Sequence, residues 1–400
     1  MFSFKNKLEK NLKFSLDNNE YKNYRVLLHY KTLKKKIEGK INRYKGNIVR
    51  SIPSLNTFCA YVSPYSLGRL LEHPEIDYAC FDEIALICGE EQSIQETNSI
   101  SLKGNYRLSG RGIGIGLVDT GVYPHEDLKK PFNKIVQFKD LIRDYSYAYD
   151  DNGHGTFISG LLCGSGENSN GRFKGIAENS HIYCIKAFNG AGKGFISDIL
   201  FALETLIDES ELNNIKLICL PFEFLNNNSF ILSLFDSIFK KAQEKGITIL
   251  VPAGHNGNTQ SSIRGIATLS SCITVGGIDT CHYPPKPYEF SSSGPYKNFQ
   301  KPDLVAACVN LTSLNSDPSY LSQRNNMKIY PRPIKKLYTS YTGTSCAVAY
   351  VCGLCALLLE NNHNLKFQDI LSLLKVSCTL LNMPKNLQGS GVINIDKLLP

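Results

Sequence analysis

From about residue 108 onward, short runs of consecutive apolar residues alternate with longer stretches in which apolar residues recur every three or four positions. Unbroken apolar runs are typical of strands buried on both faces of a sheet, and the periodic stretches are typical of helices. The runs are GIGIGLVD, HIYCIKAF, IKLICLPF, GITILVPAG and CITVGGI, and the helical stretches are FISDILFALETLI and FILSLFDSIFKKAQEKG, which stops at Gly246. This alternation predicts a doubly wound, mostly parallel α/β sheet, with long loops over residues 281–340.

The first 90 residues follow a different pattern. Segments that read as strands (YRVLLHY, FCAYVSP and YACFDEIALIC) are separated by the helical stretches LKKKIEGKINRY and SPYSLGRLLEHP. This order predicts a small α+β, ferredoxin-like fold. The polar, aperiodic segment GEEQSIQETNSISLKGNY then predicts an exposed linker. We therefore expect three parts, which are a small domain at 1–90, a linker at 91–107 and a large domain at 108–400.

The positive charge of the chain is concentrated at its start. Residues 1–50 hold 14 Lys and Arg against 4 Asp and Glu, a surplus of +10, whereas the whole chain is +8 (44 minus 36). Such a segment can bind nucleic acid or anionic membranes, but a solvated helix face is the favoured explanation. We expect neither a nucleic-acid nor a membrane partner.

Neither the start of the chain nor the apolar run after Ser345 predicts export or membrane insertion. The start lacks the continuous apolar region of a secretory signal, and the apolar run after Ser345 is short for a bilayer span. The 13 cysteines, an odd number, are scattered through apolar stretches, where Cys behaves as a small buried residue. Cys352 and Cys355 form a CxxC pair with no second pair or His nearby, so we predict no metal site there. These features predict a cytoplasmic protein.

Three polar residues lie where the predicted sheet brings its strand ends and helix beginnings together. Asp119 ends the run GIGIGLVD, His154 lies between glycines in DDNGHGTFISG, and Ser345 begins the apolar helix in YTGTSCAVAY. Each has an ordinary structural explanation, since such residues often end strands or cap helices. Together they have the order Asp, His, Ser, which is one of the known orders of a catalytic triad.

The segments LVDTGV, HEDL, DDNGHGT, FSSSGP, KPDLVA and GTSCA resemble, in order, the motifs of the subtilisin-like serine peptidases, or subtilases (peptidase family S8). The resemblance runs from about residue 108 to GVINIDKLL, and residues 1–88 are similar in element order to the family's inhibitory prodomain. It implies a serine endopeptidase in which Ser345 is the nucleophile, His154 the base, and Asp119 the group that orients His154. It also implies a monomeric precursor, inhibited by its own prodomain and cleaving itself between about Ile87 and Asn98 before acting on protein or peptide substrates.

The chain departs from the family at the oxyanion hole. Where the family has Asn in an AAGN turn, this sequence reads VPAGHNG, with His255 at the matching position and Asn256 next to it. Losing one oxyanion donor costs roughly 3 kcal/mol of transition-state stabilisation. Three alternatives remain, in which the imidazole donates, the Asn256 amide reaches the hole, or the hole is impaired. The last motivates an alternative function, a catalytically impaired protein that binds peptides or another protease.

A second departure lies in the predicted substrate groove. ICLPFEF replaces a SLG-like segment of the family, which with the NGAGKG loop binds substrate as an added strand. Pro221 has no N–H to donate, and Glu223 brings charge where glycine is usual. We predict a narrowed groove in which Glu223 either favours a basic substrate residue or points to solvent without a role. The candidate substrate-binding residues are Gly192, Gly194, Leu220, Glu223 and Gly254.

Two further features add little to this picture. Cys346 occupies a position where the family commonly has Met, and we expect it to be a packing residue because Ser345 already fits the nucleophile motif. The segment CGSGENSNGRFKG holds a single acid, Glu167, so it gives weak support for a calcium site. We predict that no metal or cofactor is required.

Overall fold

The computed structural model describes residues 7–92, 107–296 and 300–399. Most of the predicted linker at 91–107, and part of the predicted self-cleavage range, therefore lie outside the described residues. Contacts divide the chain into two compact units, one formed by Met1–Ile84 with Phe195–Thr205 and the other by Ala85–Gly194 with Leu206–Pro400.

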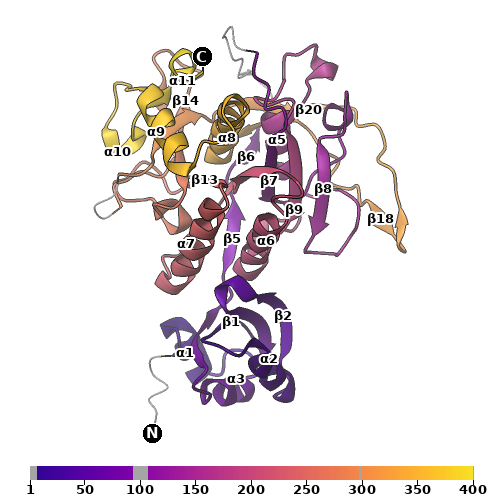
Figure 1. Ribbon diagram of the computed structural model, residues 1–400, viewed down its shortest axis with the longest axis vertical. Coiled ribbons are helices and arrows are strands. Elements are labelled where there is room, and N and C mark those ends of the chain that lie inside the picture. Colours follow the sequence, from indigo (N-terminus) through magenta and orange to yellow (C-terminus); the bar gives the residue numbers. More distant parts are fainter. Residues whose placement is uncertain (1–6, 93–106, 297–299, 400) are drawn as a thin grey trace. The chain divides into compact units, whose positions relative to one another are not determined.

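The first unit is a four-stranded antiparallel sheet in the order β2-β3-β1-β4, with helices packed on it (Figure 1). Its elements are α1 (Lys10–Asp17), β1 (Tyr24–Tyr30), α2 (Lys34–Arg43), β2 (Asn47–Ile52), β3 (Thr57–Val62), α3 (Pro64–Leu71) and β4 (Ile76–Phe81). Ile37 and Leu67, from two of the helices, pack with Val26 and Phe58 from the sheet in one buried cluster. The predicted α+β order is confirmed, with β2 as an additional strand.

The second unit is built on a large sheet in the order β21-β22-β16-β14-β13-β11-β7-β9-β8, with β15 paired to β14. The pairs from β8 to β16 are parallel, as predicted. The strands are β7 (Gly114–Asp119), β8 (Ile135–Asp140), β9 (His181–Lys186), β11 (Ile215–Cys219), β13 (Thr248–Pro252), β14 (Ile273–Asp279), β15 (Lys286–Pro287), β16 (Leu304–Ala307), β21 (Cys378–Thr379) and β22 (Val392–Ile393).

Helices cover both faces of this sheet, with α5 and α8 on one side and α7 on the other (Figure 1). The remaining helices of the chain are α4 (Glu126–Lys129), α5 (His154–Cys163), α6 (Ile196–Asp208), α7 (Ser229–Glu244), α8 (Thr344–Asn361), α9 (Phe367–Ser377), α10 (Lys385–Gln388) and α11 (Ile395–Leu398). Helix α8 is long and apolar enough to cross a membrane, but 83% of it is buried, which is typical of a central core helix. Gly246 has φ +72° just after α7, confirming the predicted helix stop.

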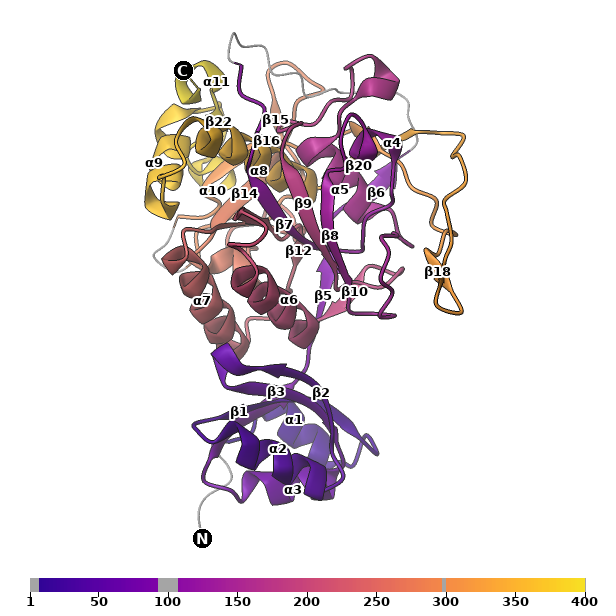
Figure 2. The same cartoon turned by 45° about the vertical axis from the view of Figure 1, so that its right-hand side comes forward.

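Two predictions about secondary structure were wrong. Residues 281–340 are not all loop, because they include β16, β17 (Leu311–Leu314), the start of β20 (Tyr338–Thr342) and a hairpin of β18 (Gln323–Arg324) and β19 (Met327–Lys328), visible in Figure 2. These strands are only two to five residues long, which is too short to give a clear alternation. The segment YACFDEIALIC is not one strand but two, β4 and β5 (Ile84–Ile87), which belong to different sheets.

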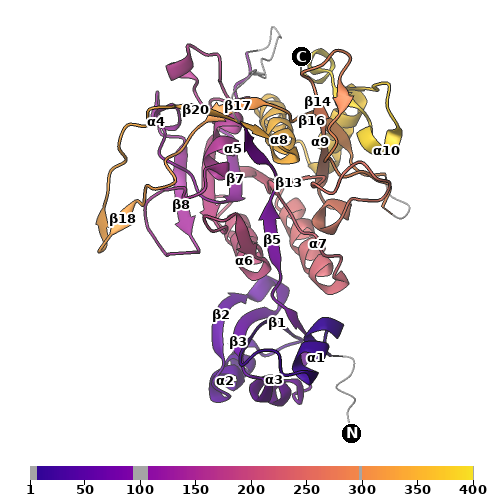
Figure 3. The same cartoon turned by 180° about the vertical axis from the view of Figure 1, so that it is seen from behind.

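Two three-stranded sheets complete the second unit. One has the order β10-β5-β12, with β10 at Lys193–Phe195 and β12 at Phe222–Glu223 (Figure 2). The other has the order β17-β20-β6, with β6 at Glu90–Gln92; β17 and β20 run side by side in Figure 3. The strands β5 and β6 are separated by only two residues, and each forms part of a different small sheet.

The beginning of α6 is held within the first unit by ion pairs. The Asp82 carboxylate contacts Arg25 Nε at 2.6 Å and accepts hydrogen bonds from the backbone N and Oγ of Ser197 at 2.9 and 2.7 Å. Arg25 and Arg50 also contact Asp198, at 3.2 and 2.6 Å. Part of the positive charge of the first 50 residues is thus neutralised by acids of the same unit.

Candidate active site

The three predicted triad residues begin or end regular elements of the second unit. Asp119 is the last residue of β7, His154 is the first residue of α5, and Ser345 is the second residue of α8. A parallel sheet places such strand ends and helix beginnings at the same edge. A helix beginning also carries free N–H groups and partial positive charge, which favour a developing anion.

A glycine next to His154 allows α5 to approach the end of β7. A Cβ atom on Gly155 would lie 2.1 Å from the carbonyl oxygen of Gly121 and 3.2 Å from the Cβ of Asp119. Real Cβ atoms do not make such contacts, so any larger residue would push the helix away. Gly155, the second glycine of DDNGHGT, therefore lets α5 approach the end of β7 closely enough to place His154 beside Asp119.

The structure brings the three side chains together in a line of hydrogen bonds. His154 Nδ1 lies 2.8 and 3.0 Å from the two carboxylate oxygens of Asp119, and His154 Nε2 lies 3.1 Å from Ser345 Oγ. All three residues are at most 1% exposed. A neutral imidazole that donates from Nδ1 to Asp119 presents the lone pair of Nε2 to the serine hydroxyl.

Burial and charge act in opposite directions on His154. Burial lowers the pKa of His154, but the charge and hydrogen bond of Asp119, with the further charge of Asp150, raise it more, so the pKa lies above 6.5. A raised pKa makes the imidazole a stronger base for the Ser345 proton. The Asp119 carboxylate also stabilises the imidazolium that forms when His154 takes the proton.

The chain's own peptide segment lies at Ser345. Ser345 Oγ lies within hydrogen-bonding distance of the carbonyl oxygen of Cys88. A Cβ atom built on the next residue, Gly89, would lie 3.3 Å from Ser345 Oγ and 3.4 Å from the Cα of Gly343. The peptide bond between Cys88 and Gly89 is therefore the one presented to the serine.

Strands hold this segment on both sides of that bond. Before it, Ile87 and Leu86 pair antiparallel with Phe222 and Glu223, and the Ile87 N–H donates to the Gly192 carbonyl at 3.2 Å. After it, β6 pairs antiparallel with β20. The segment thus occupies the groove in the way that an extended peptide adds a strand to an open sheet edge.

The other predicted groove residues have structural contacts of their own. A Cβ on Gly192 would lie 2.8 Å from the side chain of Ile87, so that glycine gives the segment room. A Cβ on Gly194 would likewise lie 3.0 Å from the ring of Phe188. Leu220 is fully buried, and its N–H donates to the carbonyl of Leu250 at 3.0 Å. Gly192 therefore contacts the segment directly, whereas Gly194 and Leu220 contact other residues of the second unit.

The turn predicted to supply the oxyanion hole is held by Glu223. One carboxylate oxygen accepts the backbone N–H of His255 at 2.9 Å and the side-chain amide of Asn256 at 3.3 Å. The Asn256 amide also lies 3.2 Å from Ser292 Oγ. Gly254 has φ +102°, and a Cβ there would lie 2.8 Å from the Glu223 oxygen. The Glu223 side chain therefore points toward the turn at Gly254–Asn256 rather than toward solvent.

The imidazole of His255 lies beside a pocket. Its ring stacks on that of Phe290, with centroids 4.7 Å apart and an interplanar angle of 4°. Its Nδ1 is buried and has no hydrogen-bond partner among the described residues. His255, Phe290 and Thr342 line a pocket of about 380 Å³, and Thr342 belongs to the strand that pairs with β6. The pocket therefore lies on the Gly89 side of the groove.

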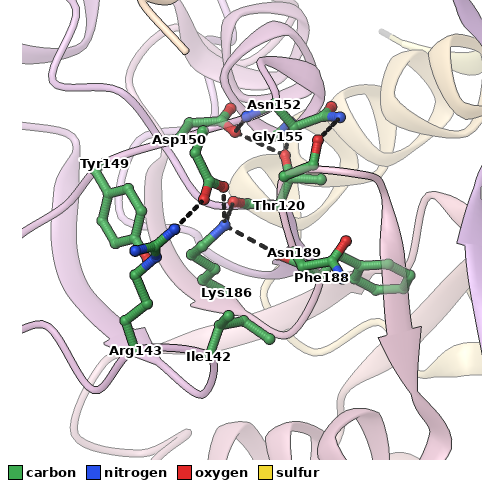
Figure 4. Close-up of polar contacts among 12 residues, drawn as sticks. Thr120, Ile142, Arg143, Tyr149, Asp150, Asn152, Gly155, Lys186, Phe188 and Asn189 are labelled. Atoms are coloured by element: carbon green, nitrogen blue, oxygen red, sulfur yellow. Dashed lines mark hydrogen bonds and ion pairs between the residues drawn. The ribbon is translucent and has the colours of Figure 1, made fainter. Parts of the chain in front are cut away.

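Lys186 was not predicted as a site residue, yet its ammonium joins three parts of the site (Figure 4). It donates to the carbonyl oxygens of Thr120 and Phe188, the second at 3.0 Å, and lies 2.6 Å from Asp151. Its side chain is fully buried. Thr120 follows Asp119, so the cation is one residue from the triad. A lysine inside the apolar run HIYCIKAF was the available signal.

The Asp150 carboxylate fixes the loop that leads to α5, the helix that begins at His154 (Figure 4). Its carboxylate accepts hydrogen bonds from Thr120 Oγ1 at 2.9 Å, from the N–H of Gly153 at 2.9 Å and from Thr156 Oγ1 at 2.6 Å. The loop before His154 is thereby fixed to the residue after Asp119. The first acid of DDNGHGT thus holds together the two elements that carry Asp119 and His154.

All thirteen cysteines lie in the described part of the chain, and no disulfide joins any two of them. Burial raises the pKa of Cys346 to about 12, so its thiol stays protonated and is a poor nucleophile. Cys352 and Cys355 are buried in α8. Among residues 7–92, 107–296 and 300–399, no group of three or more His, Cys, Asp or Glu side chains could hold a metal ion. Glu167 begins a short 3₁₀ turn.

Comparison with known proteins agrees with this geometry. The model of the subtilase family, Peptidase_S8, matches residues 110–391. Serine protease AprX of Bacillus subtilis is 29% identical over 310 residues, which are 75% of this chain and 69% of AprX. Subtilisin DY of Bacillus licheniformis is 28% identical over 291 residues, or 72% of this chain and 90% of that protein.

A solved structure shows the same fold. Fervidolysin from Fervidobacterium pennivorans, a keratinolytic enzyme related to subtilisin, superposes on 95% of this chain with a TM-score of 0.72 and 19% identity. The chain spans 61% of the fervidolysin chain. With the family model covering well over half of its length, the chain belongs to the subtilase family, a family of serine-type endopeptidases.

Proposed function

We propose that this protein hydrolyses peptide bonds in proteins or peptides through an acyl-enzyme formed on Ser345. One observation carries the proposal, which is the line of hydrogen bonds from Asp119 through His154 to Ser345, with a peptide carbonyl at the serine hydroxyl. A serine hydroxyl is a weak nucleophile at neutral pH and needs an adjacent base, which this arrangement supplies.

The reaction divides into two halves that use the same proton carrier. Ser345 Oγ attacks the carbonyl carbon while its proton moves to His154 Nε2, and the proton then passes to the leaving amine as the C–N bond breaks. In the second half, water gives a proton to His154, its oxygen attacks the acyl carbon, and the proton returns to Ser345 as the ester breaks. Asp119 keeps His154 in the required tautomer and stabilises its charged form.

The oxyanion of the tetrahedral intermediate needs hydrogen-bond donors. The N–H groups at the beginning of α8, next to Ser345, are suited to this role because they lie at the positive end of the helix. We propose the His255 imidazole as a second donor, supported by its place in the turn and by the unused Nδ1. The amide of Asn256 is engaged with Glu223 and Ser292 instead.

We further propose that the first substrate is the chain itself, cleaved between Cys88 and Gly89. This bond lies inside the range expected from the sequence, and the close approach of Ser345 Oγ to the Cys88 carbonyl supports it. Residues 1–88 would then be a prodomain whose last strand fills the groove as an intramolecular inhibitor. The monomeric state and cytoplasmic location stay predictions.

The alternative of a catalytically impaired, peptide-binding protein is not favoured. Its motivation was the altered oxyanion turn, but Asp119, His154 and Ser345 have the spacing that an active triad requires. A fluorophosphonate label reports an activated serine without any knowledge of the substrate. An impaired protein would take up little label.

The test compares the full-length chain with its Ser345→Ala variant by intact mass spectrometry. We expect the parent to yield a fragment that begins at Gly89 and to react with the fluorophosphonate, while Ser345→Ala stays full length and unlabelled. The Cys346→Ala variant is the matched control, since it changes the neighbouring residue and should behave like the parent. Continued self-cleavage of Ser345→Ala would contradict the proposed mechanism.

A further inference from the structure

The side chain of Cys88 marks the pocket for the residue that precedes a cleaved bond, because its carbonyl is the one at Ser345. Cys88 is 1% exposed, so the pocket encloses its short side chain completely. Ala85, three residues earlier, is also fully buried, whereas Leu86 and Ile87 between them are only partly buried. The two enclosed positions of this segment thus carry small residues and the two open positions carry large ones.

The carboxylate of Glu223 lies beside this pocket. Glu223 pairs with Leu86, two residues before Cys88, in the antiparallel ladder of β12 and β5. Burial and then the charge of Glu223 raise the pKa of the Cys88 thiol. The same carboxylate holds the backbone N–H of His255 and the side chain of Asn256, at 2.9 and 3.3 Å. Glu223 therefore links the turn at Gly254–Asn256 to the strand that pairs with the segment ending at Cys88.

The space around this carboxylate is already filled. A Cβ atom on Gly254 would lie only 2.8 Å from it, so even one added carbon from the turn would collide. Phe222, the residue before Glu223 in β12, is buried, and its ring packs on that of Phe188 with centroids 5.0 Å apart. A large side chain in place of Cys88 would have to displace Glu223 and leave its two donors without an acceptor, which is costly in a buried site.

We propose that Glu223 closes the pocket for the residue before the cleaved bond, so that this protein cleaves after small residues such as Cys, Ala or Ser. The inference rests on the proposed peptidase function and names its substrate class. It replaces the expectation that Glu223 attracts a basic residue, because the carboxylate already accepts two hydrogen bonds.

The first experiment measures cleavage of a peptide series built on ALIX↓GEEQ, the chain's own sequence, with X as Cys, Ala, Ser, Phe or Lys. We expect kcat/KM for Ala at least about 100-fold above that for Phe or Lys, since tightly packed pockets discriminate by such factors. Comparable or faster cleavage after Phe or Lys would overturn the inference. Failure to cleave any peptide, or to take up the fluorophosphonate, would instead count against the peptidase function.

The second experiment changes the residue that closes the pocket. In Glu223→Ala we expect the Ala-to-Phe ratio to fall to below about 10, because the pocket gains the space of the carboxylate. Glu223→Gln is the matched control, since it keeps the size and one acceptor oxygen while removing the charge, and its ratio should stay near that of the parent. If Glu223→Gln shifted the preference as Glu223→Ala does, charge rather than size would determine it, and the inference would be wrong.

The third experiment uses self-cleavage and needs no added substrate. The Cys88→Phe chain should remain full length, Cys88→Ala should mature normally, and the double variant Cys88→Phe/Glu223→Ala should recover cleavage before Gly89. Circular dichroism and fluorophosphonate labelling confirm that each chain is folded and has a reactive serine. Normal maturation of Cys88→Phe with Glu223 unchanged would refute the inference.

Discussion

Replacing Lys186 by Met tests the importance of the buried cation next to the triad. Methionine has nearly the length of lysine but no donor, so the substitution removes the ammonium while leaving the space filled. The carbonyls of Thr120 and Phe188 and the carboxylate of Asp151 then each lose the ammonium as a donor. Both carbonyls belong to residues that are fully buried.

The loss can be worked from these contacts. Removing one partner of a buried ion pair costs about 3–5 kcal/mol of unfolding free energy. Asp151 is 12% exposed and keeps Arg143 at 3.8 Å, which reduces this cost. Two unpaired buried carbonyls each cost about 1–3 kcal/mol, while relief from burying the ammonium opposes the loss. We expect a net destabilisation of about 3 kcal/mol.

The assay is urea unfolding in a Ser345→Ala background, which prevents self-digestion. Lys130→Met is the matched control, because Lys130 is 63% exposed and its pair with Glu126 should contribute under about 1 kcal/mol. The double variant Lys186→Met/Asp151→Asn should lose less than the sum of the single changes, since it leaves no unpaired charge.

The catalytic effect is measured separately, with Ser345 intact. We expect kcat of Lys186→Met to fall by about 10- to 100-fold, because the residue after Asp119 and the loop before His154 both lose their common contact. An unfolding free energy within about 0.5 kcal/mol of the parent, together with unchanged kcat, would show that the cation has neither role.

The remaining predictions concern the proton balance of the triad and the steric role of two glycines. Activity should rise with pH through a midpoint above 6.5, because the raised pKa of His154 must be passed before the imidazole is neutral; the stabilisation from protonated His154 is complete below 6.5 and is lost over the same rise. Asp119→Asn should lower kcat by about 10⁴ and shift that midpoint downward, which a pH profile of kcat/KM would show; an unmoved midpoint would contradict the assigned cause. Gly155→Ala should unfold the second unit or abolish activity, since its Cβ would lie 2.1 Å from a carbonyl oxygen. Its control, Gly68→Ala in α3, meets nothing within 4 Å and should stabilise the first unit by about 0.5–1 kcal/mol, as thermal unfolding would show.

The parts of the molecule that were predictable are those with a local signal. The parallel sheet follows from unbroken apolar runs, and Asp119, His154 and Ser345 follow from short motifs at the ends of elements. Helix α7 ends where Gly246 indicates. Strand β5 was read as the end of one longer strand, because the polar pair between Phe81 and Ile84 is too short to signal a change of sheet. The buried ammonium of Lys186 could not be placed either, because nothing local shows which acceptors it meets.

The two departures from the family pattern seemed independent in the sequence, since more than thirty residues separate Glu223 from His255. In the structure they are one arrangement, because the Glu223 carboxylate accepts the N–H of His255 and the amide of Asn256. A glycine at 223 would leave both donors without this acceptor, and a carboxylate at 223 without them would be buried and unpaired, which is unfavourable. The small pocket proposed before the cleaved bond and the turn proposed for the oxyanion hole would therefore depend on each other. A change at either position should affect both the choice of substrate and the rate of its cleavage.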